Sequence, residues 1–216
     1  LDEQLGHLYV KKYFPEESKK KVEQLVEDLL SAYRERITGL AWMSDTTKAK
    51  AMEKLDAFTY KIGYPNKWKD YSDLEITRES YLKNMMNIST YLSKENLAKL
   101  GKPVDRTEWG MGAHIVNAYY NPLNNEVVFP AGILQPPFFD AEAEDAANYG
   151  TMGAIIGHEL THGFDDQGAQ FDADGNMKMW WTKQDYENFK SKTVRIVNQF
   201  NNYVAIDTIK VNGSMT

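Results

Sequence analysis

The sequence predicts an α+β fold that is mainly helical. Several long stretches carry apolar residues at the three- and four-residue steps of amphipathic helices. Two short runs rich in β-forming residues flank a turn cluster near the middle of the chain, which is the pattern of a β-hairpin. Two histidines four positions apart follow on a further helix. At 216 residues the chain can form one large domain or two small ones.

Composition and charge exclude several classes of function. Hydrophobic residues at 42% and charged residues at 26% are ordinary for a globular protein. A net charge of −6 leaves no basic surplus to neutralise phosphates, which argues against nucleic-acid binding. No apolar run is long enough for a membrane span, so none is expected in this segment. The chain has no cysteine, so any metal must be held by His, Asp or Glu.

Three helices are predicted in the first hundred residues. The first covers residues 15–39, where apolar residues recur on one face. The second covers about 44–58, with Ser44 as its N-cap. The polar segment 66–75 reads as a packed loop, and the third helix runs from about residue 77 towards residue 100. No catalytic constellation is evident in this part of the chain.

The amino-acid pattern changes near residue 112, where helical periodicity gives way to the predicted hairpin. Residues 114–120 are rich in β-formers, residues 121–125 are a turn cluster, and residues 126–129 form the second strand. The apolar segment 131–139, rich in proline and aromatic residues, is expected to be irregular and packed.

The segment after the paired histidines predicts a turn and a final helix. The acidic run 171–176 resembles a calcium loop, but Gly175 comes too early in it and the closing glutamate is missing, so a turn is expected. Thr182 is expected to cap the last helix together with Asp185. The predicted apolar face of that helix consists of Tyr186, Phe189, Val194, Val197 and Phe200, with Tyr203 or Val204.

The run His158-Glu159-Leu-Thr-His162 is the pattern most closely tied to chemistry. Two histidines four apart lie one helical turn from each other, so both rings can reach one metal ion. With a glutamate beside the first histidine, this is the H-E-x-x-H arrangement of zinc hydrolases. The helix is expected to begin at Asn148 or Thr151. The alternative is two helical histidines that make ordinary hydrogen bonds.

Asp165 follows the motif at a suggestive spacing. It lies seven positions after His158, and it shares the histidine face if the helix continues past Gly163. A carboxylate there can accept the free ring N–H of a ligating histidine and so fix its orientation. The alternatives are a solvated helix end, or Asp165 as a substitute third ligand, for which its position is less suitable.

Several segments together resemble the family of neprilysin and endothelin-converting enzyme, with its bacterial oligopeptidase (PepO-like) relatives. The resemblance runs nearly end to end and covers the middle of a family protein that is longer on both sides. With no cysteine, the chain looks like a bacterial member, either exported (periplasmic or at the cell surface) or cytoplasmic. The matching segments are residues 116–120, 127–139, 156–166 and 174–182, and more weakly 8–10, 40–43 and 62–65.

The resemblance implies a zinc endopeptidase site. His158 and His162 would bind one Zn²⁺ ion, and Glu159 would be the general base on zinc-bound water. Asp165 would orient a ligand histidine. The family's third zinc ligand is a glutamate in a segment expected beyond Thr216, as are a histidine and an arginine that act in the reaction.

The resemblance also implies how substrate and domains are arranged. Asn117 and Ala118 match edge-strand positions that hydrogen-bond the backbone of an oligopeptide substrate. Residues 1–112 would be part of the family's helical cap domain. Residues 113–216 would be the first part of a zincin-like (thermolysin-like) catalytic domain, and the remaining parts of the same protein would be its partners.

Three readings of function remain open on the sequence alone. The first is a zinc endopeptidase that cleaves oligopeptides. The second is a segment that binds zinc weakly or is inactive without its third ligand and serves binding or structure. The third is a structural helical domain with a coincidental motif.

Overall fold

The computed structural model describes residues 2–215, and helices dominate it with two small sheets. The helices are α1 (Asp2–Tyr13), α2 (Glu16–Thr38), α3 (Asp45–Asp56), α4 (Tyr81–Leu97), α5 (Asp145–Gly150), α6 (Met152–His162), α7 (Lys183–Phe200) and the short 3-10 turns η1 (Gly168–Gln170) and η2 (Gly213–Met215). The strands are β1 (Thr59–Gly63), β2 (Tyr119–Asn121), β3 (Glu126–Pro130), β4 (Val204–Ile206) and β5 (Ile209–Lys210). The mainly helical character predicted from the sequence is confirmed.

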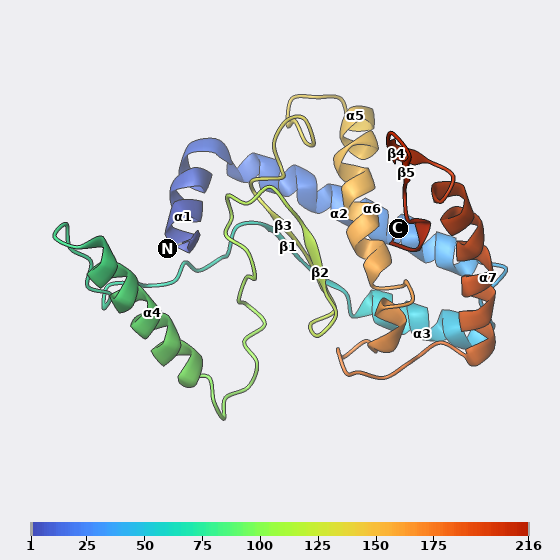
Figure 1. Ribbon diagram of the computed structural model, residues 1–216, viewed down its shortest axis with the longest axis horizontal. Coiled ribbons are helices and arrows are strands. Elements are labelled where there is room, and N and C mark those ends of the chain that lie inside the picture. Colours follow the sequence, from blue (N-terminus) through green and yellow to red (C-terminus); the bar gives the residue numbers. More distant parts are fainter. Residues whose placement is uncertain (1, 216) are drawn as a thin grey trace.

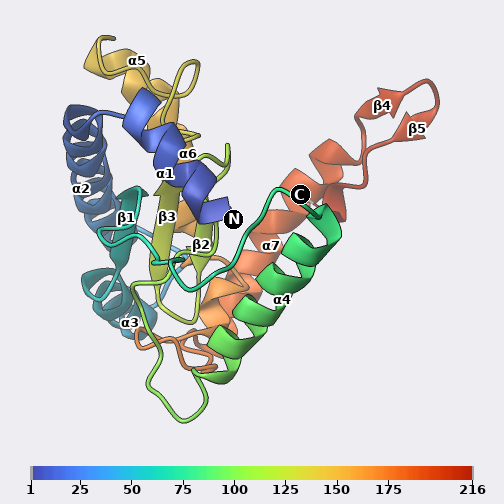
Figure 2. The same cartoon turned by 90° about the vertical axis from the view of Figure 1, so that its left-hand side faces the viewer.

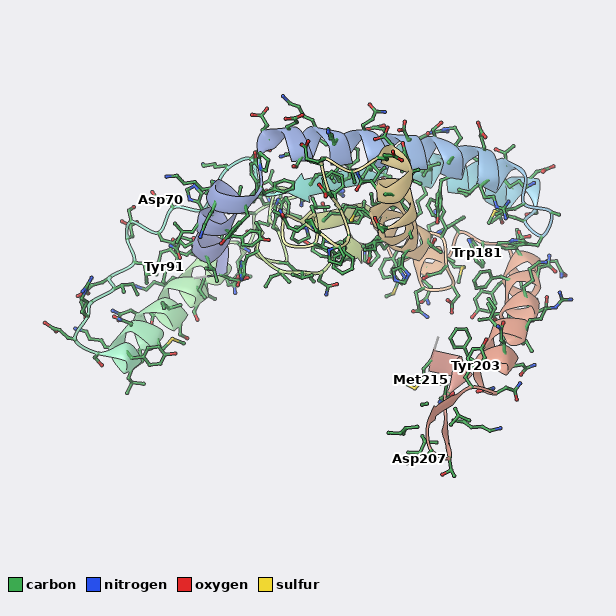
Figure 3. The ribbon with its side chains drawn as sticks, turned by 90° about the horizontal axis from the view of Figure 1, so that it is seen from above. Asp70, Tyr91, Trp181, Tyr203, Asp207 and Met215 are labelled. Atoms are coloured by element: carbon green, nitrogen blue, oxygen red, sulfur yellow. The ribbon has the colours of Figure 1, made fainter. Side chains whose placement is uncertain are left out.

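The molecule has a central body with an arm at each end. Helix α2 runs along the body, beside the three-stranded sheet and α6 (Figure 1). Viewed from above, α4 at one end and α7 with the β4–β5 hairpin at the other project from the same side, and Asp207 lies at the tip of that hairpin (Figure 3). No helix within residues 2–215 combines the length and the apolar character needed to cross a bilayer.

The central sheet contains a strand that the sequence analysis did not predict. Its order is β1-β3-β2, with β1 parallel to β3 and β2 antiparallel to β3. Strand β1 lies in the first hundred residues, where only helices and a loop were expected. It was missed because its stabilising partner, β3, lies more than sixty residues away. The boundary expected at residue 112 therefore separates two strands of one sheet.

Helices α2 and α3 form as the sequence predicts, whereas α1 was not predicted. Pro15 is the N-cap of α2, Gly39 is its C-cap, and Val22 and Val26 are fully buried on its inner face. The side chain of Ser44 accepts a hydrogen bond from the N–H of Thr47 and so caps α3. These local signals suffice to start both helices. Pro15 has no N–H that would need a partner, and Ser44 satisfies one of the free N–H groups in the first turn of α3.

Other predicted boundaries were wrong. The first hairpin strand begins at Tyr119 rather than at residue 114. Instead of pairing with β3, the segment before Tyr119 contacts the turn that follows β3, where the N–H of Gly132 donates to the carbonyl of Ala113. Helix α4 begins after Ser80, which caps it, because the side chain of Asn84 bonds the backbone of Thr77 and holds the preceding residues outside the helix.

The end of the chain differs from the prediction in two ways. Thr182 and Asp185 cap α7 as expected, with the Thr182 hydroxyl accepting from the N–H of Asp185. The predicted apolar face is covered only in part: Phe189 packs against Trp181, whereas Val194 is 49% exposed. The β4–β5 hairpin was not predicted, and its strands are exposed.

Two apolar clusters hold the body together. One lies between α2, the sheet and α6, and includes Val22, Val127, Phe129, Ile156 and Leu160. The other joins the end of α2, α3 and the start of α7, and includes Ile37, Met43, Leu55, Phe164 and Trp181. Figure 2 shows α2, the sheet and α6 stacked on one side of the molecule, away from α4 and the β4–β5 hairpin. Helix α6 packs on the first cluster, and the segment that follows it, with Phe164, packs on the second.

Candidate metal centre

Helix α6 presents the two motif histidines on the side opposite the core. Thr151 is its N-cap and Gly163 its C-cap, so the second of the two predicted starts is correct. Ile156 and Leu160, one turn apart, are fully buried against the core. The same packing turns the rings of His158 and His162 outward and fixes the helix that carries them.

The two histidine rings converge on one point. The Nε2 atoms of His158 and His162 lie 3.1 Å apart, and the ring planes are nearly perpendicular. Zn–N bonds of about 2.0–2.1 Å with tetrahedral angles place two ligand nitrogens about 3.3–3.4 Å apart. The observed 3.1 Å is within a few tenths of an ångström of that spacing, so a small shift of the rings would suit one zinc ion. Imidazole nitrogens are also a donor type that zinc prefers.

Asp165 contacts the ring of His162. Its Oδ2 lies 2.9 Å from Nδ1 of His162, the ring nitrogen that faces away from His158. The other oxygen, Oδ1, accepts from the backbone N–H groups of Gln167 at 2.9 Å and Gly168 at 2.7 Å. The assumption that the helix continues past Gly163 was wrong, since α6 ends at His162. The contact forms because the chain turns back immediately after the helix.

Glu159 is buried beside the histidines. Burial raises the pKa of its carboxyl, although His162, His158 and the backbone N–H of Tyr120 act in the opposite direction. A raised pKa makes a carboxylate a better proton acceptor near neutral pH. Glu159 and His162 both line a pocket of about 390 Å³, whose other walls include Tyr120, Pro122 and Phe171. The pocket is predominantly apolar, as a site for a peptide side chain would be.

The proposed substrate-binding positions lie next to this pocket. Ala118 lines it, and strand β2, which follows directly, is the edge strand of the sheet. Asn117 is exposed, its Oδ1 accepts from the N–H of Ala118, and it is not among the residues that line the pocket. Both residues precede β2 rather than lying in it. An unpaired strand edge is nonetheless available beside Glu159 and His162.

The other two histidines of the chain lie elsewhere. His7 stacks on Trp68, and His114 lies 3.3 Å from a carboxylate oxygen of Asp2. Within residues 2–215, no three His, Cys, Asp or Glu side chains form a group that could hold a metal ion. The described residues thus bring together two histidines, with a carboxylate bonded to one of them.

Three residues that shape the centre were not predicted from the sequence. The backbone N–H of Tyr120 bonds Glu159, and Gly168 provides one of the amide donors to Asp165. Lys54, only 1% exposed, donates to the carbonyl oxygens of Gly168 and Phe171. The sequence does hold a signal for Lys54, because this charged residue lies on the same helical face as the buried Ala51 and Leu55.

Comparisons with known proteins identify relatives over nearly the whole chain. Two family models, both described as peptidase family M13, match residues 1–65 and 117–216. The neutral endopeptidase of Lactobacillus helveticus is 44% identical over 99% of this chain and 33% of its own length.

Solved structures show the same relationship. PepO from Lactobacillus rhamnosis covers the whole chain at 37% identity with a TM-score of 0.92. A zinc metalloprotease of Mycobacterium tuberculosis in complex with an inhibitor covers 98% of the chain at 47% identity with a TM-score of 0.89. These matches take up 34% and 33% of the two solved chains.

The chain therefore spans about a third of the length of the relatives it matches. The family models agree with the segments on which the sequence resemblance rests, and the relatives they group are named neprilysin, neutral endopeptidase and endothelin-converting enzyme homolog. This chain belongs to peptidase family M13.

Proposed function

We propose that the protein containing this chain is a zinc-dependent endopeptidase that hydrolyses oligopeptides, with His158 and His162 as zinc ligands and Glu159 as general base. The observation that carries the proposal is the convergence of the two Nε2 atoms, 3.1 Å apart, beside a buried glutamate in an open pocket. Two histidines engaged only in ordinary hydrogen bonding would not require a glutamate at that position.

The roles of the residues follow from their contacts. Bound zinc would supply Lewis acidity that polarises the scissile carbonyl. Glu159 takes a proton from the attacking water and passes it to the leaving amine, a task suited to a carboxylate whose pKa is raised by burial. Asp165 holds the ring of His162 in the orientation that leaves Nε2 free for the metal.

An extended peptide would add to the open edge of the sheet. Within residues 2–215, β2 pairs with β3 alone. Apart from the N–H of Tyr120, which bonds Glu159, the backbone groups on its other side would be available to a substrate strand. Ala118, at the mouth of the pocket, and Asn117, exposed beside it, would bond the substrate backbone. The apolar pocket would then receive one of its side chains.

The third zinc ligand would come from the part of the protein after Thr216, as a glutamate. Residues 113–216 would form the first part of a zincin-like catalytic domain, and residues 1–112 would contribute to a helical cap. The length of the relatives, about three times that of this chain, supports a site completed by other segments of the same protein. The sheet formed by β1 and β3 would join the two parts.

The test is a pair of measurements on the intact protein, zinc content and hydrolysis of a quenched fluorescent peptide. We expect one zinc per chain and activity that a chelator abolishes. Glu159→Ala should retain zinc while turnover falls by about two to four orders of magnitude. Glu187→Ala, on the exposed side of α7, is the matched control. Absence of zinc, or full activity of Glu159→Ala, would overturn the proposal.

A further inference from the structure

Lys54 is a buried cation with no role in the reaction described above. It lies in the last turn of α3 and is only 1% exposed. Its Nζ donates to the carbonyl oxygens of Gly168 and Phe171, each at 2.7 Å, and lies over the rings of Tyr120 and Trp180. Among the described residues no carboxylate forms an ion pair with it.

A lysine is an expensive residue at such a position. Burial of an ammonium group costs several kcal/mol, and apolar side chains of similar volume commonly stabilise a core more. Burial lowers the pKa of Lys54 to about 8, opposed by the charges of Asp165 and Asp172. A packing role alone would be served better by methionine or leucine. The lysine therefore points to a requirement for its donors or its charge.

The two carbonyls that Lys54 binds belong to the turn that holds Asp165. The N–H of Gly168 donates to Asp165, while the carbonyl of the same residue accepts from Lys54 and from Nε1 of Trp180. Lys54 thus fixes the peptide unit next to the amide that fixes Asp165. Asp165 in turn fixes His162.

The backbone of Lys54 reaches the other side of the site. Its carbonyl accepts from the side-chain amide of Asn125, whose oxygen accepts from the hydroxyl of Tyr120. The backbone N–H of Tyr120 bonds Glu159. One residue of α3 is therefore connected both to the turn that orients the histidine and to the strand that contacts the general base.

We propose that Lys54 is a positioning residue of the metal centre, which holds the 168–171 turn so that Asp165 stays directed at His162. This inference rests on the proposed function, because it takes His162 as a zinc ligand. Partners that orient metal ligands change affinity by about 10- to 100-fold when they are removed. Since Lys54 acts through Asp165, its loss should fall at the lower end of that range.

The test is a double-mutant cycle in the intact protein, with the zinc dissociation constant measured by chelator competition. We expect Lys54→Met to weaken zinc binding about 10-fold and Asp165→Asn by about 10- to 100-fold. The double variant should bind zinc no more weakly than Asp165→Asn alone, because both changes break one chain of contacts. Lys50→Met, at an exposed position one turn earlier on α3, should bind zinc as the wild type does.

Each result of the cycle decides the question. Equal zinc affinity of Lys54→Met and wild type would overturn the inference. It would also be overturned if the fold-changes in the zinc dissociation constant caused by the two single substitutions multiplied in the double variant. A purely structural role would lower the melting temperature of the zinc-free protein without changing zinc affinity. If Lys54→Met does not fold, Lys54→Leu, which also lacks a donor, enters the same cycle. Failure of the wild type to bind zinc would instead overturn the proposed function.

Discussion

Gly168 lies where any side chain would collide with the end of the motif helix. A Cβ at this position would be 2.1 Å from the carbonyl oxygen of His162 and 2.5 Å from the carbonyl carbon of Gly163. Both obstacles are backbone atoms, so neither can rotate away. The close approach is needed because the N–H of Gly168 must reach Asp165. The absence of a Cβ at Gly168 thus permits the turn that holds Asp165 against His162.

Gly168→Ala should therefore damage the metal centre. Relief of the collision must move the 163–168 turn, and we expect a loss of about 1–3 kcal/mol in the free energy of unfolding together with weaker zinc binding. Thermal unfolding and chelator competition on the intact protein measure both. Gly150→Ala, where a Cβ meets nothing within 4 Å, is the control. Wild-type zinc affinity in Gly168→Ala would contradict the assigned role of the turn.

The site residues differ in how far the sequence could predict them. His158, Glu159 and His162 are recognisable because their chemistry depends on spacing within one helix, which local sequence determines. Asp165 was predicted to orient a histidine from a helical continuation that does not exist, and the contact forms through a turn instead. Lys54 was not predicted because its partners are more than a hundred residues away and are backbone carbonyls, which carry no sequence signal.

At the scale of elements, helices α3 and α7 share one buried carboxylate. Asp185 accepts hydrogen bonds from the N–H and hydroxyl of Ser44 and from the hydroxyls of Thr47 and Thr182. Ser44 and Thr182 are the N-caps of the two helices. The carboxylate therefore fixes both helix starts relative to each other and joins the end of the chain to its first half.

The Asp185 contact should weaken in acid. Burial alone would raise the pKa of Asp185, but the hydrogen bonds from Ser44, Thr182 and Thr47 outweigh it and lower the pKa to about 2. Since an unfolded aspartate titrates near pH 3.9, the stabilisation is complete above about pH 4 and is lost as the pH falls towards 2. Hydrogen exchange of the Ser44 amide measures this. Between pH 5 and pH 3, we expect the protection of this amide to decline in the wild type and to stay unchanged in Asp185→Asn, because the variant lacks the titrating group. An equal decline in the wild type and the variant would contradict the assignment.

Besides their apolar packing, helices α2 and α6 share hydrogen bonds of one phenol. The hydroxyl of Tyr33 donates to the carbonyl of Gly157 at 2.9 Å and contacts the hydroxyl of Thr161. Tyr33→Phe should cost about 1 kcal/mol, because the Gly157 carbonyl keeps its bond from Thr161. Denaturant unfolding of the intact protein, with Tyr81→Phe at an exposed position as control, measures the loss. A Tyr33→Phe variant as stable as the control would show that this contact does not hold α6 in place.

The elements that could be predicted are those fixed by their own residues. Helices α2 and α3 carry both their caps and their apolar faces within the segment, and they form where the sequence places them. Strand β1 could not be recognised because five residues with a distant parallel partner leave no local periodic pattern. The hairpin was found from its turn, but its first strand was predicted too long because the preceding residues pack on a neighbouring turn.

At the scale of the whole molecule, the arms lack a core of their own. No residue of α4 is buried, and the β4–β5 hairpin is exposed along both strands. The apolar side chains exposed on α4 are Tyr81, Leu82, Met85, Met86, Leu92 and Leu97. The chain corresponds to only about a third of the length of its relatives. An exposed apolar face such as that of α4 is suited to contact with other parts of the same protein.

Oxidative labelling of methionine tests this arrangement. Met86, on α4, is 63% exposed in this structure. We expect Met86 to oxidise several-fold more slowly in the intact native protein than in the same protein unfolded by denaturant, because other segments cover α4. Oxidation of Met86 at the unfolded rate would mean that α4 faces solvent in the complete protein.

The position of the metal tests the central claim most directly. Anomalous diffraction at the zinc edge, from crystals of the intact protein, should give one peak about 2.0–2.1 Å from Nε2 of both His158 and His162. Asp165 should remain bonded to Nδ1 of His162, and Glu159 should lie beside the peak without binding it. A peak elsewhere, or none at these histidines in a protein that cleaves peptides, would contradict the account of the centre.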